Sequence, residues 1–373
     1  MILNKELTPK KRVELALQKK FADKVPFTVY GGFWQSVGAE NPSTPFNRYL
    51  PQSYVERQLR NKGLCIVELS CFGYLMIRPD VRVTSTAYEE KGRLMIRTDY
   101  ETPFGNVYAI KEISDFTIWI KKFMFSRKED YKVIEFILKN SQVLPDNKTA
   151  ERAMRLFGED VILRGDFGFE PLQELITGDY FGPERFCIEW MDNRDEILKL
   201  YEILVNVRRK EYKVVADSPL YFVCYGGNVV PEIISPDNFQ KYYIPHYNEA
   251  AEELHKAGKV LGCHFDANNK AYKDIIAAAD MDIIEAFTPS PVTDMSMKEA
   301  RDAWPDKVLW INFPSTTHLD SQEKIAETTN QIIDDAGPVG LLIGITEDVP
   351  EERWWPNYTT IMDTIDKKFN IKY

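Results

Sequence analysis

Short apolar runs alternate with amphipathic helical segments along most of this chain. From residue 148 onward, each segment with apolar positions at helical spacing precedes a short apolar run such as Val161-Ile-Leu, which is typical of a buried parallel strand. Two similar runs lie earlier in the chain. The expected strands begin near residues 26, 65, 161, 220, 259, 283, 308 and 341. Strands joined by helical crossovers in this number predict an α/β fold, a closed (β/α)8 TIM barrel.

An open, doubly wound sheet is the alternative to a closed barrel. Such a sheet normally has a glycine-rich phosphate-binding loop after its first strand, and Gly31-Gly-Phe-Trp34 at that place is not one. The barrel is therefore the expected fold. The length suits one large domain, which we expect to cover residues 1–373.

Residues 81–112 interrupt the alternation of strands and helices. Val81-Arg-Val-Thr-Ser-Thr and Arg93-Leu-Met-Ile-Arg-Thr alternate apolar and polar positions, and Thr102-Pro-Phe-Gly-Asn106 turns the chain. This pattern predicts an antiparallel β-hairpin with one polar face, added to the barrel.

Capping residues predict where several helices begin. Thr8 precedes Pro9 and indicates an N-terminal helical addition, and Ser235 precedes Pro236 at the start of an expected helix over 236–257. Ser126 is the expected cap of a helix over 127–139.

Composition and charge exclude several classes of protein. The net charge is −10, from 47 Lys and Arg against 57 Asp and Glu, so a nucleic-acid partner is not expected. No apolar stretch reaches the roughly 18 residues that a membrane helix needs, and residues 1–12 lack the apolar core of a signal peptide. The five cysteines show no CxxC spacing, which favours a reducing cytoplasm.

A polar cluster follows the apolar run at 259–262. His264 and Asp266 are two positions apart, so in extended backbone their side chains point to the same side. Imidazole and carboxylate together suit zinc or another divalent metal, and a buried histidine bonded to a loop aspartate is the alternative. In a barrel, polar residues that follow the strands share one mouth. The other candidates by position are Asp166, Glu170, Asn228, Glu285, Asn312, Glu347 and Asp348.

Several motifs resemble the uroporphyrinogen decarboxylase superfamily over nearly the whole chain. Ser235-Pro-Asp-Asn-Phe-Gln-Lys-Tyr-Tyr-Ile-Pro245-His-Tyr resembles its SPxxFxxxxxPxY helix. Gly262-Cys-His264-Phe-Asp266 and Asp282-Ile-Ile-Glu285-Ala-Phe resemble its signature after the fifth and sixth strands. The superfamily contains the decarboxylase and the cobalamin-dependent methyltransferases of methanogens and acetogens.

The resemblance favours the methyltransferase branch. The decarboxylase needs arginine after the first strand to hold a tetra-acidic porphyrin, and the sequence from Val29 to Gly38 has none. The methyltransferases use zinc, with His-x-Cys after the fifth strand and a cysteine after the eighth. Here Asp266 and Glu347 stand at or near those thiolate positions. An oxygen-rich zinc site is a better Lewis acid toward an ether or amine, which implies demethylation of a substrate.

Roles for individual residues follow from this resemblance and from position. His264, Glu347 and Asp266 are the predicted zinc ligands, although Asp266 could instead orient His264, and Glu347 could be a loop or capping acid. Glu170 and Asn228 could contact substrate, with a helix cap and a chain turn as the alternatives. The expected aromatic wall is Phe33, Trp34 and Phe72. His318 could contact substrate or lie on the surface.

The predicted function is removal of a methyl group from a small donor, a methoxylated aromatic, and its transfer to a corrinoid. No corrinoid-binding DxHxxG stretch occurs, so the cobalamin is expected on a separate corrinoid-binding protein. Two alternatives remain open. One is methyl transfer from the corrinoid protein to a thiol or tetrahydrofolate, and the other is a non-catalytic barrel that binds a ligand or partner. Assembly into a homo-oligomer is also left open.

Overall fold

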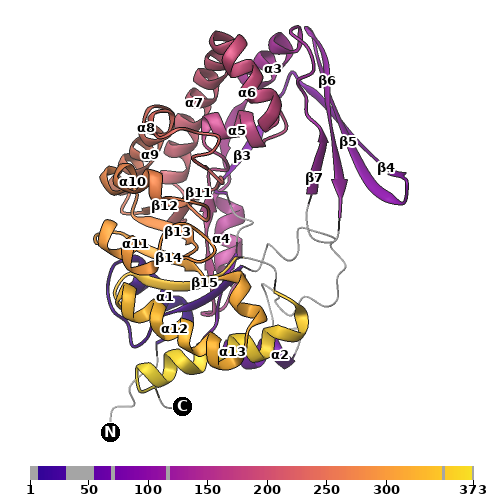
Figure 1. The fold of residues 1–373 in the computed structure, drawn as a ribbon. Coiled ribbons are helices and arrows are strands. Elements are labelled where there is room, and N and C mark those ends of the chain that lie inside the picture. Colours follow the sequence, from indigo (N-terminus) through magenta and orange to yellow (C-terminus); the bar gives the residue numbers. More distant parts are fainter. Residues whose placement is uncertain (1–6, 31–53, 69–71, 115–117, 347–348, 372–373) are drawn as a thin grey trace.

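A closed parallel barrel forms the body of the protein (Figure 1). The computed structural model describes the chain apart from residues 1–6, 31–53, 69–71, 115–117, 347–348 and 372–373. Its parallel strands are β1 (Phe27–Tyr30), β2 (Cys65–Glu68), β9 (Val161–Leu163), β10 (Gly165–Asp166), β11 (Phe222–Tyr225), β12 (Val260–His264), β13 (Ile283–Phe287), β14 (Val308–Asn312) and β15 (Leu341–Ile345). β1 pairs with β15 and β2, and each later strand pairs with its neighbour in sequence from β10 to β15.

The barrel closes through the split strand β9–β10. β9 pairs with β2, β10 pairs with β11, and only Arg164 separates the two short strands. β9 and β10 are therefore one barrel strand, and the barrel has the eight strands that the sequence predicts. The (β/α)8 fold is confirmed, and an open sheet is excluded.

Helices follow most strands and cover the outside of the barrel. They are α1 (Pro9–Leu17), α2 (Tyr54–Asn61), α3 (Asp130–Lys139), α4 (Asn147–Leu156), α5 (Pro171–Thr177), α6 (Pro183–Asp192), α7 (Arg194–Ala216), α8 (Pro236–Tyr242), α9 (Ile244–Lys256), α10 (Lys273–Ala278), α11 (Met297–Ala303), α12 (Gln322–Ala336) and α13 (Glu351–Lys368). Short 3-10 helices lie at Lys270–Tyr272 (η1) and Ser315–Leu319 (η2). Among the helices of the described chain, none is long and apolar enough to cross a membrane.

Local sequence explains most helix starts, with two corrections. The side chains of Thr8 and Ser235 accept hydrogen bonds from the backbone N–H groups three residues on, as predicted. The expected helix over 236–257 is divided at Tyr243, because Pro245 lacks the N–H that would continue the hydrogen-bond ladder. Ser126 does not cap α3; instead the Asp130 carboxylate accepts from the N–H groups of Ser126 and Arg127.

An antiparallel sheet projects from the barrel where the hairpin was predicted. It consists of β4 (Arg82–Glu90), β5 (Arg93–Thr102), β6 (Gly105–Ile113) and β7 (Ile118–Lys122), in that order across the sheet. A separate pair, β3 (Tyr74–Ile77) and β8 (Gln142–Pro145), flanks it in sequence. The addition is therefore larger than residues 81–112. The assignment of residues 1–373 to one domain of the superfamily stays a prediction.

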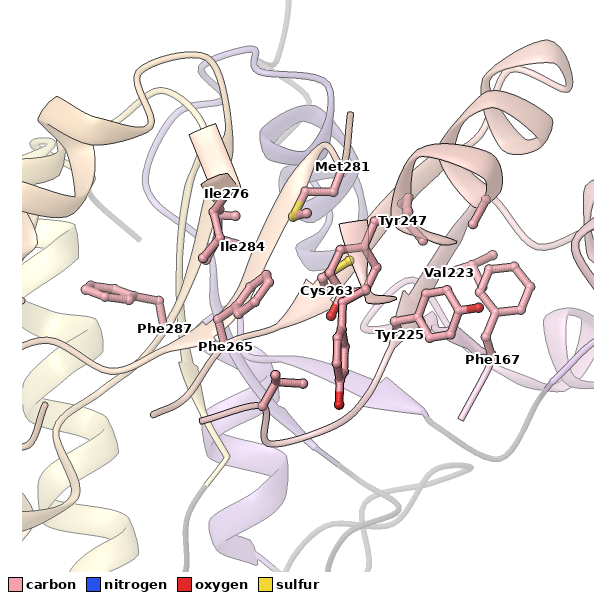
Figure 2. Packing of buried hydrophobic residues seen from close by; sticks show 14 of the residues in the cluster. Phe167, Val223, Tyr225, Tyr247, Cys263, Phe265, Ile276, Met281, Ile284 and Phe287 are labelled. Atoms are coloured by element: carbon pink, nitrogen blue, oxygen red, sulfur yellow. The ribbon is translucent and has the colours of Figure 1, made fainter. Parts of the chain in front are cut away.

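Two apolar clusters hold the barrel together. The larger one lies between the strands and the surrounding helices, and Figure 2 shows part of it, where Tyr225, Tyr247, Cys263 and Phe265 pack together. The smaller one fills the barrel interior. Its members include Val67, Ile162, Phe222, Cys224, Ile283, Val308, Trp310 and Leu342. Side chains alternate between these two clusters along each strand, as expected for strands buried on both faces.

Candidate functional site

The barrel interior becomes polar at the carboxyl ends of the strands. Arg164 lies between β9 and β10, and its guanidinium contacts Asp166 at 2.7 Å, Glu285 at 3.2 Å and the Tyr30 hydroxyl at 3.4 Å. Glu285 belongs to β13 and Tyr30 to β1, so these contacts cross the inside of the barrel. Arg164, Glu285 and Tyr30 are buried, and Asp166 is partly buried. They define the mouth at which a (β/α)8 barrel normally carries its chemistry.

His264 is held in this mouth by Glu285. The two residues are register partners on β12 and β13, and the imidazole Nδ1 lies 2.6 Å from Glu285 Oε2. Burial raises the pKa of the Glu285 carboxyl to about 8. The Arg164 guanidinium, 3.2 Å from the other carboxyl oxygen, acts in the opposite sense and favours the ionised form. In that form the carboxylate only accepts hydrogen bonds, so Nδ1 then donates and Nε2 keeps its lone pair.

Asp266 faces the free nitrogen of His264. Its Oδ2 lies 3.4 Å from His264 Nε2, and its Oδ1 is buried without a hydrogen-bond partner within the described chain. Ligand atoms each about 2.0–2.2 Å from a tetrahedral zinc stand roughly 3.3 Å apart. A histidine whose Nδ1–H is fixed by a carboxylate is also the common form of a zinc-ligating imidazole. The pair therefore fits two ligands of one divalent metal.

A complete metal site is not visible in the part of the chain that the structure describes. There, no three His, Cys, Asp or Glu side chains converge as metal ligands. The third predicted ligand, Glu347, lies outside the described residues, and so does Asp348. The zinc assignment therefore stays a prediction supported by two of its three proposed ligands.

A β-bulge aims the residues at the end of β13. The register of β13 against β14 shifts between Glu285 and Phe287, and the extra residue, Ala286, has a positive φ of 58°. Glu285 points into the mouth, whereas Phe287 packs outside the barrel against Trp304. Regular alternation would turn both side chains inward. The bulge therefore keeps the Phe287 ring out of the mouth.

Glu170 lies near the mouth at the N-cap position of α5, but its side chain has another partner. It precedes α5, yet its side chain makes no capping hydrogen bond. Instead, Tyr247 donates to Glu170 Oε1 at 2.6 Å, while Oε2 is buried without a hydrogen-bond partner among the described residues. Burial raises the pKa of this carboxyl to about 7. Glu170 thus occupies the N-cap position of α5 without capping it through its side chain, and contact with substrate stays a prediction.

The other predicted residues have diverse surroundings. Asn228 follows β11 and is exposed, and only its backbone carbonyl has a described bond, from Gln173. His318 is buried against Phe313 and Tyr358, so the surface alternative is wrong; burial lowers its pKa to about 4. Phe72 is 43% exposed and packs on Tyr74. Phe33 and Trp34 lie outside the described residues. The functional roles of these residues stay predictions.

Arg164 and Tyr30 are the members of the mouth that sequence reasoning missed. Arg164 follows the apolar run Val161-Ile-Leu, and Tyr30 follows Phe27-Thr-Val, so the sequence places both in packed strands. The alternation of side chains along the strand could have identified Arg164, because it lies two positions after Ile162, which faces the barrel interior. A charged residue at an inward position near the end of a strand indicates a polar site in the mouth.

Comparisons with known proteins support the fold. No protein-family model and no curated protein sequence matches the chain. A methyltransferase from Methanosarcina mazei aligns over 98% of this chain and 100% of its own, with a TM-score of 0.58 and 13% identity. A B12-independent methionine synthase from a Shewanella species aligns over 85% of this chain and 87% of its own, with a TM-score of 0.45 and 9% identity. The first likeness shows a shared barrel fold, and the second is too weak to carry an argument.

Proposed function

We propose that this protein is a methyltransferase that takes a methyl group from a small donor, a methoxylated aromatic compound, and transfers it to a corrinoid on a separate protein. The observation that carries the proposal is the pair formed by His264 Nε2 and Asp266 Oδ2, 3.4 Å apart in a polar barrel mouth. The likeness in fold to the methyltransferase from Methanosarcina mazei supports it. The motifs around His264 and Glu285 support it independently of the fold.

His264 and Asp266 would hold a zinc ion, with Glu347 as the proposed third ligand. When bound, zinc supplies a Lewis acid that polarises the methyl-bearing oxygen of the donor. An oxygen-rich ligand set suits this role better than activation of a thiol. Two proposed carboxylates and a neutral imidazole also leave the site without the thiolates that the thiol-methylating relatives use.

The remaining mouth residues orient this ligand pair. Glu285 holds the Nδ1 proton of His264 and thereby directs Nε2 toward Asp266. Arg164 neutralises the buried Glu285 carboxylate, and Asp166 fixes the other side of the guanidinium at 2.7 Å. This series of charged contacts would hold the imidazole in one orientation.

Metal content tests the proposal. The purified protein should contain about one zinc per chain, and His264→Ala should abolish zinc binding while leaving the melting temperature nearly unchanged. His255→Ala is the matched control, because the His255 side chain is 43% exposed and its imidazole contacts Asp282 at 2.8 Å, away from His264. Protein that contains no zinc and cannot take it up would exclude this mechanism.

Methyl transfer is the second part of the test. The protein, incubated with reduced corrinoid protein and a panel of methoxylated aromatics, should convert the corrinoid to its methylated form, followed by its absorption spectrum. His264→Ala should stop this conversion, and His255→Ala should not. Full transfer by His264→Ala would show that the imidazole is only structural.

A further inference from the structure

The projecting sheet has a long free edge. β4 is an edge strand of nine residues that pairs only with β5 within the described chain, and Figure 1 shows it on the side of the sheet away from the barrel. Eight of its nine residues are exposed, and its pairing with β5 has no bulge. The charged residues Arg82, Glu89 and Glu90 lie at its ends, and the five-residue centre, Val83–Ala87, has no charge or proline. Such an edge is a template for pairing with another strand.

The hairpin turn determines which backbone groups point outward. β4 and β5 are joined by Lys91 and Gly92, both with positive φ, as in a type I′ turn. Glu90 and Arg93 then form a hydrogen-bonded pair, and every second residue back along β4 bonds to β5. The backbone groups of Val83, Ser85, Ala87 and Glu89 therefore point to the free edge.

We propose that β4 pairs antiparallel with β4 of a second copy of this chain, about a two-fold axis at Thr86. In this register Ser85 faces Ala87 and Val83 faces Glu89, so all outward backbone groups form hydrogen-bonded pairs. The two four-stranded sheets become one continuous sheet, and the free edge is removed. The proposal is independent of the methyl transfer proposed above.

Charge favours this register, because it is the one that places opposite charges together at both ends of β4. Arg82 of each copy faces Glu90 of the other, in the narrower, non-hydrogen-bonded positions where side chains lie closest. A two-fold axis at Ser85 would instead place Asp80 against Glu90, two like charges. Within the chain, Arg82 reaches Glu101 only at 3.7 Å, with its side chain 76% exposed, so it is available to a partner.

Oligomeric state against concentration tests the pairing. Sedimentation velocity should show a reversible dimer of the full chain at micromolar concentration. Ala87→Pro removes an outward N–H that the second copy would bind, so this variant should be a monomer. The sheet itself should be kept, because that N–H takes no part in the pairing with β5. Arg82→Glu should weaken the dimer about tenfold, since it places like charges together twice, and adding Glu90→Arg should restore it.

Lys121→Glu on β7 is the matched charge reversal at the other edge of the sheet, and it should not change the dimer. Circular dichroism and melting temperature verify that each variant keeps its fold. A chain that is monomeric at all concentrations would overturn the proposal. So would a dimer that persists in Ala87→Pro or that does not respond to Arg82→Glu.

Discussion

Two parts of the barrel interior are built from the same strands and differ in chemistry. The lower interior is the apolar cluster inside the barrel, and the mouth lies above it at the carboxyl ends of the strands. Ile162 and Ile283 pack with Trp310 in an apolar cluster. Two positions further along the same strands, Arg164 and Glu285 form an ion pair at 3.2 Å. Two residues of extended strand span only about 6.6 Å. The barrel interior therefore changes from apolar packing to charged contacts between one inward-facing residue and the next on the same strand.

This difference separates the source of stability from the source of function. Apolar side chains in the lower interior lose contact with water and gain dense packing, which stabilises the fold. Charged side chains in the mouth lose hydration, and their mutual contacts offset that cost only in part. Changes in the lower interior should therefore mainly affect folding, and isosteric changes at the ligand pair and its Glu285 partner should mainly affect binding.

Trp310→Ala should have the largest effect on stability. Trp310 is fully buried, stacks on Phe222 with ring centres 5.2 Å apart, and donates to Thr28 Oγ1 at 3.0 Å. Its loss leaves a cavity in the barrel interior and should lower the free energy of unfolding by about 3–5 kcal/mol. Urea unfolding measures this. Trp119→Ala, at a side chain 59% exposed, is the control, and an equal loss there would contradict the comparison.

The buried carboxyl of Glu170 should make stability depend on pH. Burial raises its pKa to about 7 in the folded state, above its ordinary value of 4.5. The folded protein therefore binds this proton more tightly than the unfolded chain does. The resulting contribution to the stability of the fold is complete below about pH 4.5 and is lost as the pH rises through about 7. The free energy of unfolding should fall across this window by on the order of 3 kcal/mol relative to Glu170→Gln.

Glu170→Gln is the matched variant because it keeps an oxygen for the Tyr247 hydroxyl and cannot titrate. Chemical unfolding of both proteins at several pH values gives the difference directly. A difference that stays flat between pH 4.5 and 8 would show that this carboxyl titrates normally. An increase with pH would reverse the sign of the argument.

Glu285→Gln should have the smallest effect on the free energy of unfolding of the three variants. It should weaken metal binding without a comparable loss of stability. The amide keeps the shape of the side chain but no longer holds the Nδ1 proton of His264 by charge. Zinc affinity should fall about 10–100-fold. Competition with a chelator measures that affinity, and thermal unfolding should show no matching loss of stability. A variant that unfolds before it loses zinc affinity would place Glu285 with the structural residues.

Sequence predicted the barrel well because alternation of apolar runs and helices is a repeated, local signal. Each of the eight strands contains a short apolar run, and Ser235 with Pro236 indicates a helix start without any tertiary information. The projecting sheet was predicted too small. β7 follows β6 without a turn signal as clear as Thr102-Pro-Phe-Gly, and β3 pairs with β8, which is distant in the sequence.

The mouth could be predicted only in part. Position after a strand correctly indicated that His264, Asp266 and Glu285 lie together. It did not reveal Arg164, whose partners come from strands far apart in sequence, nor the Tyr247 hydroxyl that binds Glu170. Such contacts depend on how strands are arranged around the barrel, which no local pattern encodes.

The positive φ of Ala286 makes the width of the mouth depend on a residue that carries no polar group. A β-branched residue at this position would be strained at a φ of 58° and would favour regular alternation in β13. With residue 286 retained, that alternation turns the Phe287 ring inward, above Glu285 and beside His264. A homologous chain with valine or isoleucine here would therefore keep every charged group of the mouth and still have it filled. The identity of residue 286 is thus as informative about the mouth as substitutions at His264.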